Sequence, residues 1–572
     1  MNNDKLSNQL NLALTATPLE REESLDLDMG YDAKNNTWEL IIKYTKDIQY
    51  IQAELNFELV PLFNGYGIIN ISEDKIERLS RYPEIIFIDK PMPMYFTLDR
   101  ATREVCANNV KRIEDLSGKG VCVAVIDSGI DYTHPDFRND DGSTRILAIW
   151  DQTISGNPPN GYIMGSLFTK ADINAALMND TFLPTADISG HGTHVAGIAC
   201  GNGRASNRRY EGVAPNSDML IVKLGNATDN NPAKTSQIMQ AIDFCMKTAI
   251  EINEPLVINL SFGNNYGSHN GQNIIEDYIN SIATMWKTSI VVGTGNEGSA
   301  SLHNSGIIRN GQRKEIEISV PGAEFSFNLQ FWKKYQDEIE VEIIAPNNQS
   351  SGRIKALLGA QDFILNDTRI LLYYGSPIPI NILQEIYIEF LPEASYYITP
   401  GIWKIALHGI NVIDGEYNMW LPSGAKLISD TKFLDPDKDI SLTIPSTAYR
   451  VISVAAYNSI DDSYAEFSGR GYTLSPYSVK PDLCAPGVGI VSCAPNASYV
   501  QRSGTSMATP FVAGAAALLM EWGIVKNNDN YMYGEKLKAN LINGSKPILS
   551  FTEYPNRQIG WGALCIEDSI PF

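Results

Sequence analysis

Short apolar runs that alternate with helical segments constrain the fold of this 572-residue chain more than any other feature. Residues 121–126 form a continuous apolar run, which is typical of a strand covered on both faces of a parallel sheet. The apolar runs and helical stretches that follow lie at 219–224, 236–251, 256–260, 273–287 and 289–292. Strands that alternate with helices predict an α/β fold with a doubly wound parallel sheet.

Two polar residues stand directly after predicted strands. Asp127 follows the run 121–126, and Asn296 lies in the glycine-rich turn 293–298 after the last run. Open α/β sheets place their functional sites at the carboxyl ends of the strands, so both side chains are expected at one edge of the sheet. Either residue alone is also compatible with an ordinary turn or helix cap, because Asp and Asn are frequent at both.

Two further motifs place a polar side chain at the start of a buried helix. His191 opens the small-residue stretch 191–199, and Ser506 precedes the apolar run 511–519. The N–H groups at a helix N-terminus favour a developing negative charge, which suits a reacting hydroxyl. His191 and His194 do not match the His-Glu-x-x-His zinc motif in spacing and lack its glutamate, so we predict no metal site.

An acid, an imidazole and a hydroxyl in this chain order predict nucleophilic catalysis. A serine hydroxyl becomes nucleophilic near pH 7 when an imidazole takes its proton and a carboxylate orients that imidazole. Asp127, His191 and Ser506 supply these groups, and the amide of Asn296 can donate to an oxyanion. The predicted chemistry therefore requires no cofactor, whereas structural calcium is a question that the sequence leaves open.

Charge and composition argue against several kinds of partner and location. The net charge of −21 disfavours nucleic acid and anionic membranes. We expect no signal peptide, because no basic segment followed by an apolar run opens the chain, and no membrane span, because no apolar run approaches about 20 residues. Seven scattered cysteines without CxxC spacing predict reduced thiols and a protein made in the cytoplasm.

The remaining segments predict two accessory domains. Residues 1–95 show a β-α-β-α-β order typical of a small α+β, ferredoxin-like module. Residues 306–444 show period-two alternation, which predicts an inserted antiparallel β-sandwich without evident chemistry. The α/β domain then comprises 96–305 and 445–572.

Three motifs, at 125–129, 191–197 and 504–510, closely resemble the signature motifs of subtilisin-like serine proteases. The turn 295–298 looks like the oxyanion-hole turn of that family, and the resemblance spans about 115–305 and 445–565. It implies a catalytic triad of Asp127, His191 and Ser506, with Asn296 in the oxyanion hole. Phe511 departs from many subtilases, which have His after the proline, but it lies outside the triad.

The same resemblance implies how peptides bind and how the chain matures. The implied substrate-binding residues, which would flank an extended peptide by backbone pairing, are Gly225, Leu260, Ser261, Phe262 and Gly263. Residues 1–95 would be a prodomain that assists folding and is removed by self-cleavage. The cleavage region would be Met94, Tyr95, Phe96 and Thr97, although the two prolines at 91 and 93, taken alone, are more typical of a linker.

The overall layout is most similar to the Csp-type germination proteases of clostridial spores. The shared features are the prodomain, a long segment between Asp127 and His191, and a β insert before the serine motif, which in that group is a jelly roll. This resemblance implies a protein substrate, the proenzyme of a spore cortex hydrolase, and packaging in the spore. It also implies that the cleaved prodomain can stay bound.

Two alternatives remain at this stage. Some Csp proteins have lost triad residues, so the chain could be a catalytically silent binding or signalling protein on a subtilase scaffold. It could also be a general intracellular subtilase with another protein substrate. Retention of Asp127, His191, Ser506 and Asn296 favours an active endopeptidase, and labelling by a fluorophosphonate probe discriminates the silent protein from the enzyme.

Overall fold

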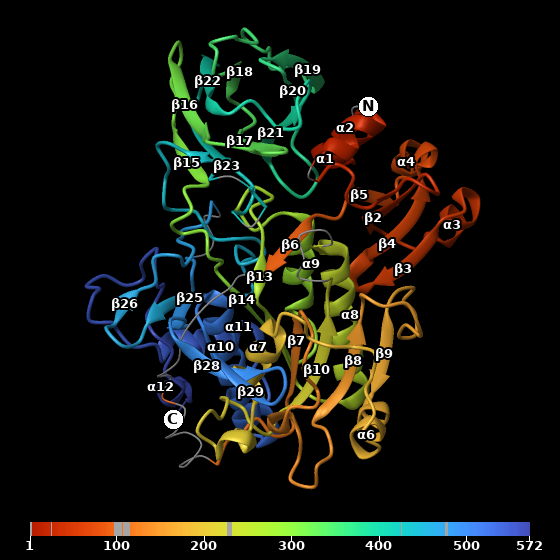
Figure 1. The fold of residues 1–572 in the computed structure, drawn as a ribbon, viewed down its shortest axis with the longest axis vertical. Helices are drawn as coiled ribbons and strands as arrows, with labels where there is room; N and C mark the ends of the chain where they lie inside the picture. Colours follow the sequence, from red (N-terminus) through yellow and green to blue (C-terminus); the bar gives the residue numbers. More distant parts are fainter. Residues whose placement is uncertain are drawn as a thin grey trace. The chain divides into compact units, whose positions relative to one another are not determined.

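The computed structural model divides into two compact units (Figure 1). It describes residues 3–24, 26–96, 106, 115–225, 232–424, 426–428, 430–474 and 479–571. One unit, here the α/β unit, comprises Met94–Gly263, Ile275–Gly298 and Leu442–Phe572. The other comprises Met1–Pro93, Asn264–Ile274 and Ser299–Ser441, and so combines an N-terminal module with the β insert.

The α/β unit is built on a mainly parallel sheet with the order β26-β25-β14-β12-β7-β10-β8-β9, and β27 pairs with β25. Its strands are β7 (Cys122–Asp127), β8 (Ile146–Asp151), β9 (Ser166–Thr169), β10 (Asp218–Lys223), β12 (Leu256–Leu260), β14 (Thr288–Gly293), β25 (Ile452–Asn458), β26 (Ser463–Tyr464) and β27 (Leu483–Pro486). The edge strands β9 and β26 are antiparallel. The strands expected at 121–126, 219–224, 256–260 and 289–292 are therefore present, whereas β8 and β9 were not expected.

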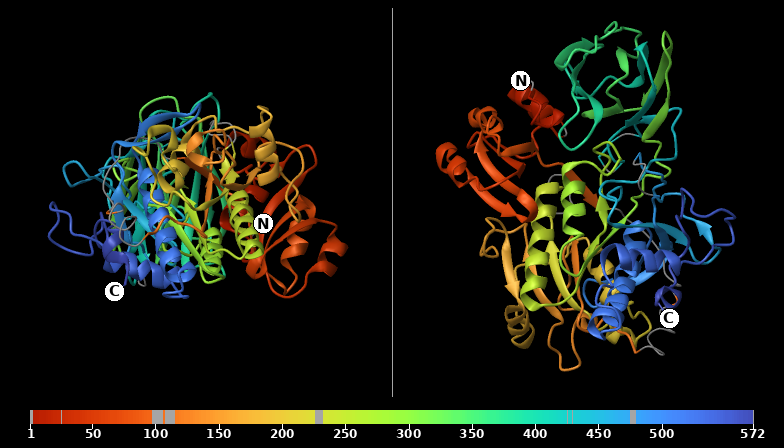
Figure 2. Two further views of the ribbon diagram at one scale, coloured as in Figure 1. Left: turned by 90° about the horizontal axis from the view of Figure 1, so that it is seen from below. Right: turned by 180° about the vertical axis from the view of Figure 1, so that it is seen from behind.

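Helices cover the sheet. They are α6 (Lys170–Met178), α7 (His191–Cys200), α8 (Thr235–Ile252), α9 (Ile274–Ile282), α10 (Thr505–Met520), α11 (Gly534–Asn543) and α12 (Ile566–Ser569). Val123 and Val125 of β7 share a core cluster with residues of α7 and α10, and the intervening Ala124 is also fully buried. The view from behind in Figure 2 shows α8 and α9 in front of the sheet. Strand β7 is thus covered on both faces, as its apolar run predicted.

Helix α10 runs through the core of this unit. All of its residues are buried, and a Cβ at Gly514 would lie 2.5 Å from Cβ of Val213, so a glycine is needed for the close approach. Within the part of the chain that the structure describes, Thr505–Val525 is long and apolar enough, by length and composition, to cross a membrane. Because 89% of its apolar window is buried inside the fold, we assign it as a core helix.

Short elements complete the α/β unit. A small sheet has the order β11-β6-β13, formed by β6 (Pro93–Phe96), β11 (Ala233–Lys234) and β13 (Phe262–Gly263). A separate hairpin is formed by β28 (Ile490–Ala494) and β29 (Ser498–Arg502). Short 3-10 turns lie at η2 (Pro135–Phe137) and η3 (Arg204–Ser206), and the π-helical turn η4 (Glu521–Val525) continues α10.

The N-terminal module is an antiparallel sheet with helices. Its elements are α1 (Asn8–Thr15), α2 (Pro18–Glu23), β1 (Tyr31–Asp32), β2 (Thr37–Tyr44), α3 (Gln49–Leu55), β3 (Glu58–Leu62), the 3-10 turn η1 (Phe63–Gly65), β4 (Tyr66–Ser72), α4 (Glu73–Ser80) and β5 (Ile85–Asp89). The strand order is β1-β2-β4-β3, with β5 beside β2. The β-α-β-α-β expectation missed β3, in which Pro61 argues against a strand; β3 is an edge strand, where proline is tolerated.

The β insert consists of two antiparallel sheets, with the orders β15-β23-β17-β21-β20-β19 and β18-β22-β16-β24. Its strands are β15 (His303–Ile307), β16 (Arg313–Val320), β17 (Phe327–Lys334), β18 (Glu338–Ile344), β19 (Gly359–Leu365), β20 (Thr368–Tyr374), β21 (Leu383–Pro392), β22 (Gly401–Asn411), β23 (Glu416–Trp420) and β24 (Lys432–Phe433). Ile316, Ile318 and Val320 alternate into the cluster between the sheets. The first strand begins at His303, just before the boundary expected at 306.

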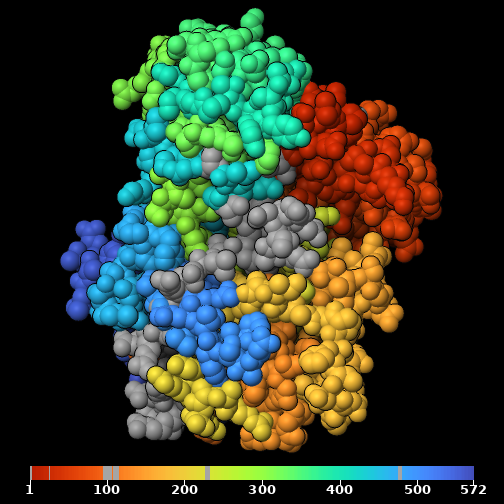
Figure 3. All heavy atoms as spheres, in the orientation of Figure 1, coloured from red at the N-terminus to blue at the C-terminus, as the bar shows by residue number. Residues whose placement is uncertain are grey.

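The N-terminal module and the insert share a second core. Helices α1 and α2 lie against the six-stranded sheet of the insert, near β20 and β21 (Figure 1). Tyr373 and Tyr387 of the insert belong to the same apolar cluster as Leu10 and Ile88 of the module. In Figure 3 the red atoms of the module meet the teal atoms of the insert. Two segments that are far apart in sequence therefore complete one core.

Candidate active site

Asp127 and His191 form a buried pair at the edge of the sheet. Asp127 is the last residue of β7, and His191 is the first residue of α7. His191 Nδ1 lies 2.7 Å from Asp127 Oδ1, and both side chains are buried. A carboxylate can only accept, so Nδ1 carries the proton and Nε2 is the basic nitrogen of the neutral ring. This is the tautomer that a general base requires.

Glycines bring strand and helix together at this pair. Gly190, the N-cap of α7, has φ 68°, a left-handed conformation that glycine adopts at little cost. A Cβ at Gly192 would collide with the carbonyl oxygen of Gly129 and lie 3.1 Å from Cβ of Asp127. The small-residue motif around His191 is therefore a consequence of the close approach of α7 to the end of β7.

Ser506 lies at the same edge. It is the second residue of α10, and its Oγ donates to the carbonyl oxygen of Ser261 at 3.0 Å. Ser261 follows β12, whose Leu260 pairs with Ile126 of the neighbouring β7. Adjacent parallel strands thus bring the carboxyl end that carries Asp127 next to the residue that Ser506 contacts, as the sequence predicted for this edge.

Asn296 follows β14 and is anchored by the residue that precedes Ser506. Its Oδ1 accepts from the backbone N–H of Thr505 at 3.1 Å and from Thr505 Oγ1 at 3.2 Å. The amide oxygen is therefore occupied, which leaves the Nδ2 donors to interact with an oxyanion. The sequence predicted Asn296 but not Thr505, because only the fold brings residue 505 next to the turn after β14.

A segment of the chain itself pairs with the strand that follows Ser261. β6 is antiparallel to β13, with Phe96 opposite Phe262 and Tyr95 opposite Gly263. On its other side lies β11. Tyr95 and Phe96, expected in the cleavage region, and Phe262 and Gly263, expected to bind an extended peptide, are thus neighbours.

Other predicted residues lie elsewhere. Met94 belongs to β6, whereas Thr97 is outside the described residues. Leu260 is the last residue of β12 and pairs with β7 and β14 in the main sheet. Gly225 is buried and precedes the undescribed residues 226–231, and β11, at Ala233–Lys234, lies beside β6 on the side opposite β13. The implied roles of Leu260 and Gly225 in substrate binding stay predictions.

A second buried carboxylate, Asp187, was missed by the sequence analysis. Its Oδ1 accepts from Ser128 Oγ at 2.7 Å and from the N–H of Gly190 at 2.9 Å. Its Oδ2 accepts from the N–H of Thr193 at 2.8 Å and from Thr193 Oγ1 at 2.7 Å. Asp187 therefore ties the residue after Asp127 to the first turn of α7. An acid just before a helix start is a capping signal that could have indicated it.

His194 has a structural environment. Its Nε2 donates to the carbonyl oxygens of Ile490 and Val500 at 3.0 and 3.1 Å, which ties α7 to the β28–β29 hairpin. Burial, with a contribution from Arg502, lowers the pKa of His194 to about 3. The ring is therefore neutral at physiological pH and acts as a donor within the core.

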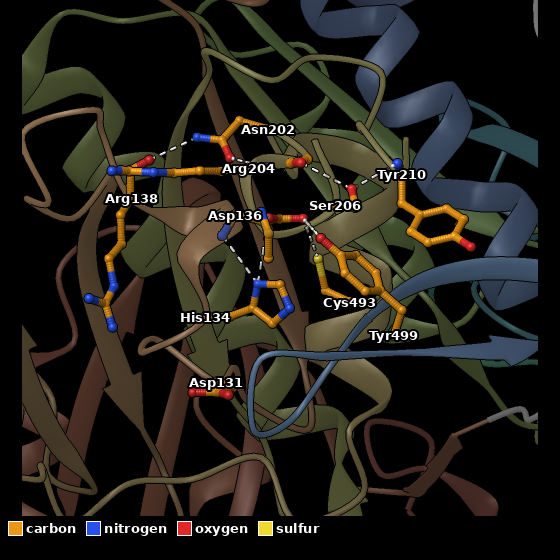
Figure 4. A network of polar contacts seen from close by, with 12 residues as sticks. Asp131, His134, Asp136, Arg138, Asn202, Arg204, Ser206, Tyr210, Cys493 and Tyr499 are labelled. Carbon is orange, nitrogen blue, oxygen red and sulfur yellow. Dashed lines mark hydrogen bonds and ion pairs between the residues drawn. The ribbon is translucent and has the colours of Figure 1, made fainter. Parts of the chain in front are cut away.

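Among the described residues, His134, Asp136 and Cys493 have the spacing of possible metal ligands (Figure 4). The Asp136 carboxylate accepts from Tyr499 OH at 2.8 Å and from Cys493 Sγ at 3.3 Å. His134 Nδ1 accepts from the N–H of Asp136 at 3.1 Å, and Nε2 donates to the carbonyl oxygen of Ser498 at 3.2 Å. Because each candidate ligand atom has a protein partner, we assign this network a role in holding the hairpin.

Comparison with known proteins gives two family matches. The Csp protease B prodomain model matches residues 4–92, and the subtilase family model matches residues 118–360 and 432–562. Among solved structures, the CspB protease of Clostridium perfringens is 36% identical with a TM-score of 0.76, over 81% of this chain and 95% of that chain. The prodomain match coincides with the N-terminal module described above.

Curated relatives include larger proteases. The PI-type proteinase of Lactococcus lactis subsp. cremoris is 25% identical over 464 residues, which cover 74% of this chain and 24% of the relative. The minor extracellular protease Vpr of Bacillus subtilis (strain 168) is 24% identical over 476 residues, which cover 79% of this chain and 52% of the relative. This chain thus spans much less than the full length of either protein. Since the subtilase model matches more than half of the 572 residues, the chain belongs to the subtilase family.

Proposed function

We propose that this chain is a serine endopeptidase with Ser506 as nucleophile, His191 as general base and Asp127 as the residue that orients His191. The observation that carries the proposal is the buried 2.7 Å contact of Asp127 with His191, at the sheet edge where Ser506 lies in the first turn of α10. Membership of the subtilase family supports the same assignment.

In the proposed reaction, Ser506 Oγ attacks the carbonyl carbon of the scissile peptide while His191 Nε2 takes its proton. Asp127 stabilises the resulting imidazolium, and Asn296 Nδ2 donates to the oxyanion. The tetrahedral intermediate collapses as His191 returns the proton to the leaving amine. Water, activated by the same imidazole, then hydrolyses the acyl-enzyme and restores the serine.

The pairing of β6 with β13 supports self-cleavage. Tyr95 lies opposite Gly263 and Phe96 opposite Phe262. Phe262 directly follows Ser261, whose carbonyl oxygen accepts from Ser506 Oγ at 3.0 Å. The described end of β6 therefore pairs with the residues next to the proposed nucleophile. We infer that the chain cuts itself in the region 94–97 expected from the sequence, of which Thr97 lies outside the described residues.

The accessory parts fit this maturation. The module order β3-β4-β2-β5 is that of a ferredoxin-like fold, and we interpret it as a prodomain that assists folding. We interpret the insert, with its two antiparallel sheets, as a jelly roll. The proposed chemistry requires no cofactor, because nucleophile, base and oxyanion donor are side chains of this chain.

We propose a protein substrate that binds as an extended strand between β11 and β13. Backbone pairing recognises a main chain more than particular side chains, so selectivity must come from elsewhere on the substrate. The likeness to the Clostridium perfringens CspB protease supports a role in spore germination, with the proenzyme of a cortex hydrolase as substrate. The protein would then be made in the cytoplasm and packaged in the spore, with the cleaved prodomain retained.

Self-cleavage tests the proposal directly. Wild type, Ser506→Ala and the matched control Ser498→Ala, an exposed serine in β29, are compared on denaturing gels. We expect two fragments for wild type and control and one intact chain for Ser506→Ala. Two fragments from Ser506→Ala would exclude Ser506 as the nucleophile.

A catalytically silent binding protein is the second candidate. The specific observation in its favour is that β6 already lies between β11 and β13, where a substrate strand would bind. A fluorophosphonate probe discriminates the two, because only an activated serine reacts. Failure to label Ser506 after removal of the N-terminal module would favour the silent protein.

A further inference from the structure

The N-terminal module and the insert pack against each other through a shared cluster of apolar side chains. Leu371, Tyr373, Tyr387 and Leu391, all on β20 and β21, belong to the apolar cluster of the module. Each has at most 5% of its surface exposed. These insert residues would lie open to water if the module left.

Two buried glutamates of β21 face the first helices of the module. Glu385 accepts from Asn8 Nδ2 and Gln9 Nε2, both at 2.8 Å. Glu389 accepts from Ser24 Oγ at 2.9 Å, just after α2. The exposed fractions of Glu385 and Glu389 are 2% and 0%. No cation among the described residues lies at hydrogen-bonding distance from either carboxyl group, and such buried groups are costly to ionise.

We propose that strands β20 and β21 form the docking surface that keeps the N-terminal module bound after self-cleavage. We also propose that Glu385 and Glu389 make this binding weaker as the pH rises. The proposal rests on the proposed function in so far as self-cleavage turns this intramolecular interface into one between two fragments. It gives the insert a role that its sequence did not indicate.

The sign of the pH effect follows from burial. Burial raises the pKa of Glu385 and of Glu389 from 4.5 to about 8. Separation of the fragments exposes both groups, so each loses its proton at any pH between these two values. The dissociation constant should therefore rise with pH up to about 8 and then level off, by roughly tenfold per pH unit for each group that titrates.

Other titratable groups at the interface also contribute to the pH dependence of the dissociation constant. Burial raises the pKa of Asp89 to about 6, so Asp89 contributes no slope above that pH. Burial lowers the pKa of Lys90, which alone would strengthen the hold as pH rises. Burial also raises the pKa of Asp28. Tyr266 OH donates to Asp26, and Tyr387, whose pKa is raised by burial, stays neutral. A variant in which only Glu385 and Glu389 are replaced therefore separates their contribution from that of these other groups.

The test separates cleavage from retention. In a Ser506→Ala chain, a recognition site for an unrelated protease is inserted after Thr97, so that the two fragments form whether or not the chain can cut itself. The cut protein is run on gel filtration at pH 6.5 and at pH 8, and the fraction of N-terminal fragment that co-elutes is measured. The same is done for Glu385→Gln with Glu389→Gln, and for Glu338→Gln, an exposed glutamate of β18.

We expect the fragment to co-elute at pH 6.5 and to be lost progressively towards pH 8, by at least tenfold in dissociation constant. The double glutamine variant, in which positions 385 and 389 are neutral at every pH, should lose most of this pH dependence, while Glu338→Gln behaves as the parent. Equal retention by the parent at both pH values, or an undiminished pH dependence in the double variant, would overturn the proposal. Failure of wild type to cut itself would instead count against the proposed function alone.

Discussion

The contacts of Asn296 with Thr505 determine which end of its side-chain amide can interact with an oxyanion. Its oxygen accepts twice from Thr505, so the nitrogen is the end that remains for an oxyanion. We expect Asn296→Ala to lower kcat by about 10²–10³-fold with little change in KM, a range measured on a subtilisin, a relative of this chain. Initial rates on a peptide substrate check this, and an unchanged kcat would remove Asn296 from the mechanism.

We expect Asp187 to position His191 for the proposed reaction. It links Ser128 to Gly190 and Thr193, and so sets where α7 begins relative to β7. We expect Asp187→Asn to lower kcat by roughly 10–100-fold, with KM nearly unchanged, because His191 loses its alignment with Asp127. Kinetics over a range of pH give the readout, since a misaligned imidazole also shifts the acidic limb of the kcat/KM profile.

The control for Asp187 is Asp180→Asn, an exposed residue of the same connecting segment. It should leave kcat and the pH profile as in wild type. A loss of thermal stability in Asp187→Asn without any change in the pH profile would mean that Asp187 is structural only.

Among the individual residues, the sequence predicted those whose role is indicated by a motif of neighbouring residues. Asp127, His191, Asn296 and Ser506 each stand at a strand end or helix start that the neighbouring residues define. Thr505 and Asp187 were not predicted, because their roles depend on contacts with segments distant in sequence. The implied role of Leu260 in substrate binding stays a prediction, and its backbone pairs within the main sheet.

Among the elements, α10 sets the tightest packing requirement. Gly514 faces Val213 with no room for a methyl group. We expect Gly514→Ala to destabilise the α/β unit by about 1–3 kcal/mol, since an added methyl must displace well-packed neighbours. Urea unfolding of the Ser506→Ala background measures this. Gly322→Ala, where a Cβ would meet nothing within 4 Å, is the matched control and should be nearly neutral.

Strands with continuous apolar runs were predictable, whereas those defined by their partners were not. β7, β10, β12 and β14 are buried on both faces and so are uniformly apolar. β3 contains Pro61 and pairs on one side only, so residue propensities do not predict it as a strand. The pairing of β6 with β13 could not be predicted from propensity either, because it joins a proline-containing segment to a strand of two residues.

At the scale of the whole molecule, the two units should respond to pH in opposite directions. In the α/β unit, burial lowers the pKa of His194 to about 3 and that of Lys480 to about 7, so the unfolded chain binds extra protons below pH 6.5 at His194 and above pH 7 at Lys480. Both groups lower the stability of this unit on acidification from pH 8 to 5.5, and the pKa of Glu254, raised by burial to about 7, offsets this loss only in part. In the other unit, the raised pKa values of Glu385 and Glu389, each about 8, mean that the folded state binds more protons between pH 4.5 and 8. That unit gains stability over the same change.

Calorimetry of Ser506→Ala at pH 8 and pH 5.5 tests this expectation. The transition of the unit with the module and insert should move to higher temperature at pH 5.5, and that of the α/β unit to lower temperature. Glu385→Gln with Glu389→Gln should abolish the first shift and leave the second. Parallel shifts of both transitions would contradict the assignment of these groups.

The shared core of module and insert also has a consequence for biosynthesis. The ribosome releases residues 1–93 well before residues 371–391, which complete that core. At about 5–20 residues per second, the apolar side chains of residues 1–93 that pack against the insert stay exposed for on the order of tens of seconds. Truncated translation products that end before β20 should therefore depend on chaperones, whereas those that extend past β21 should not.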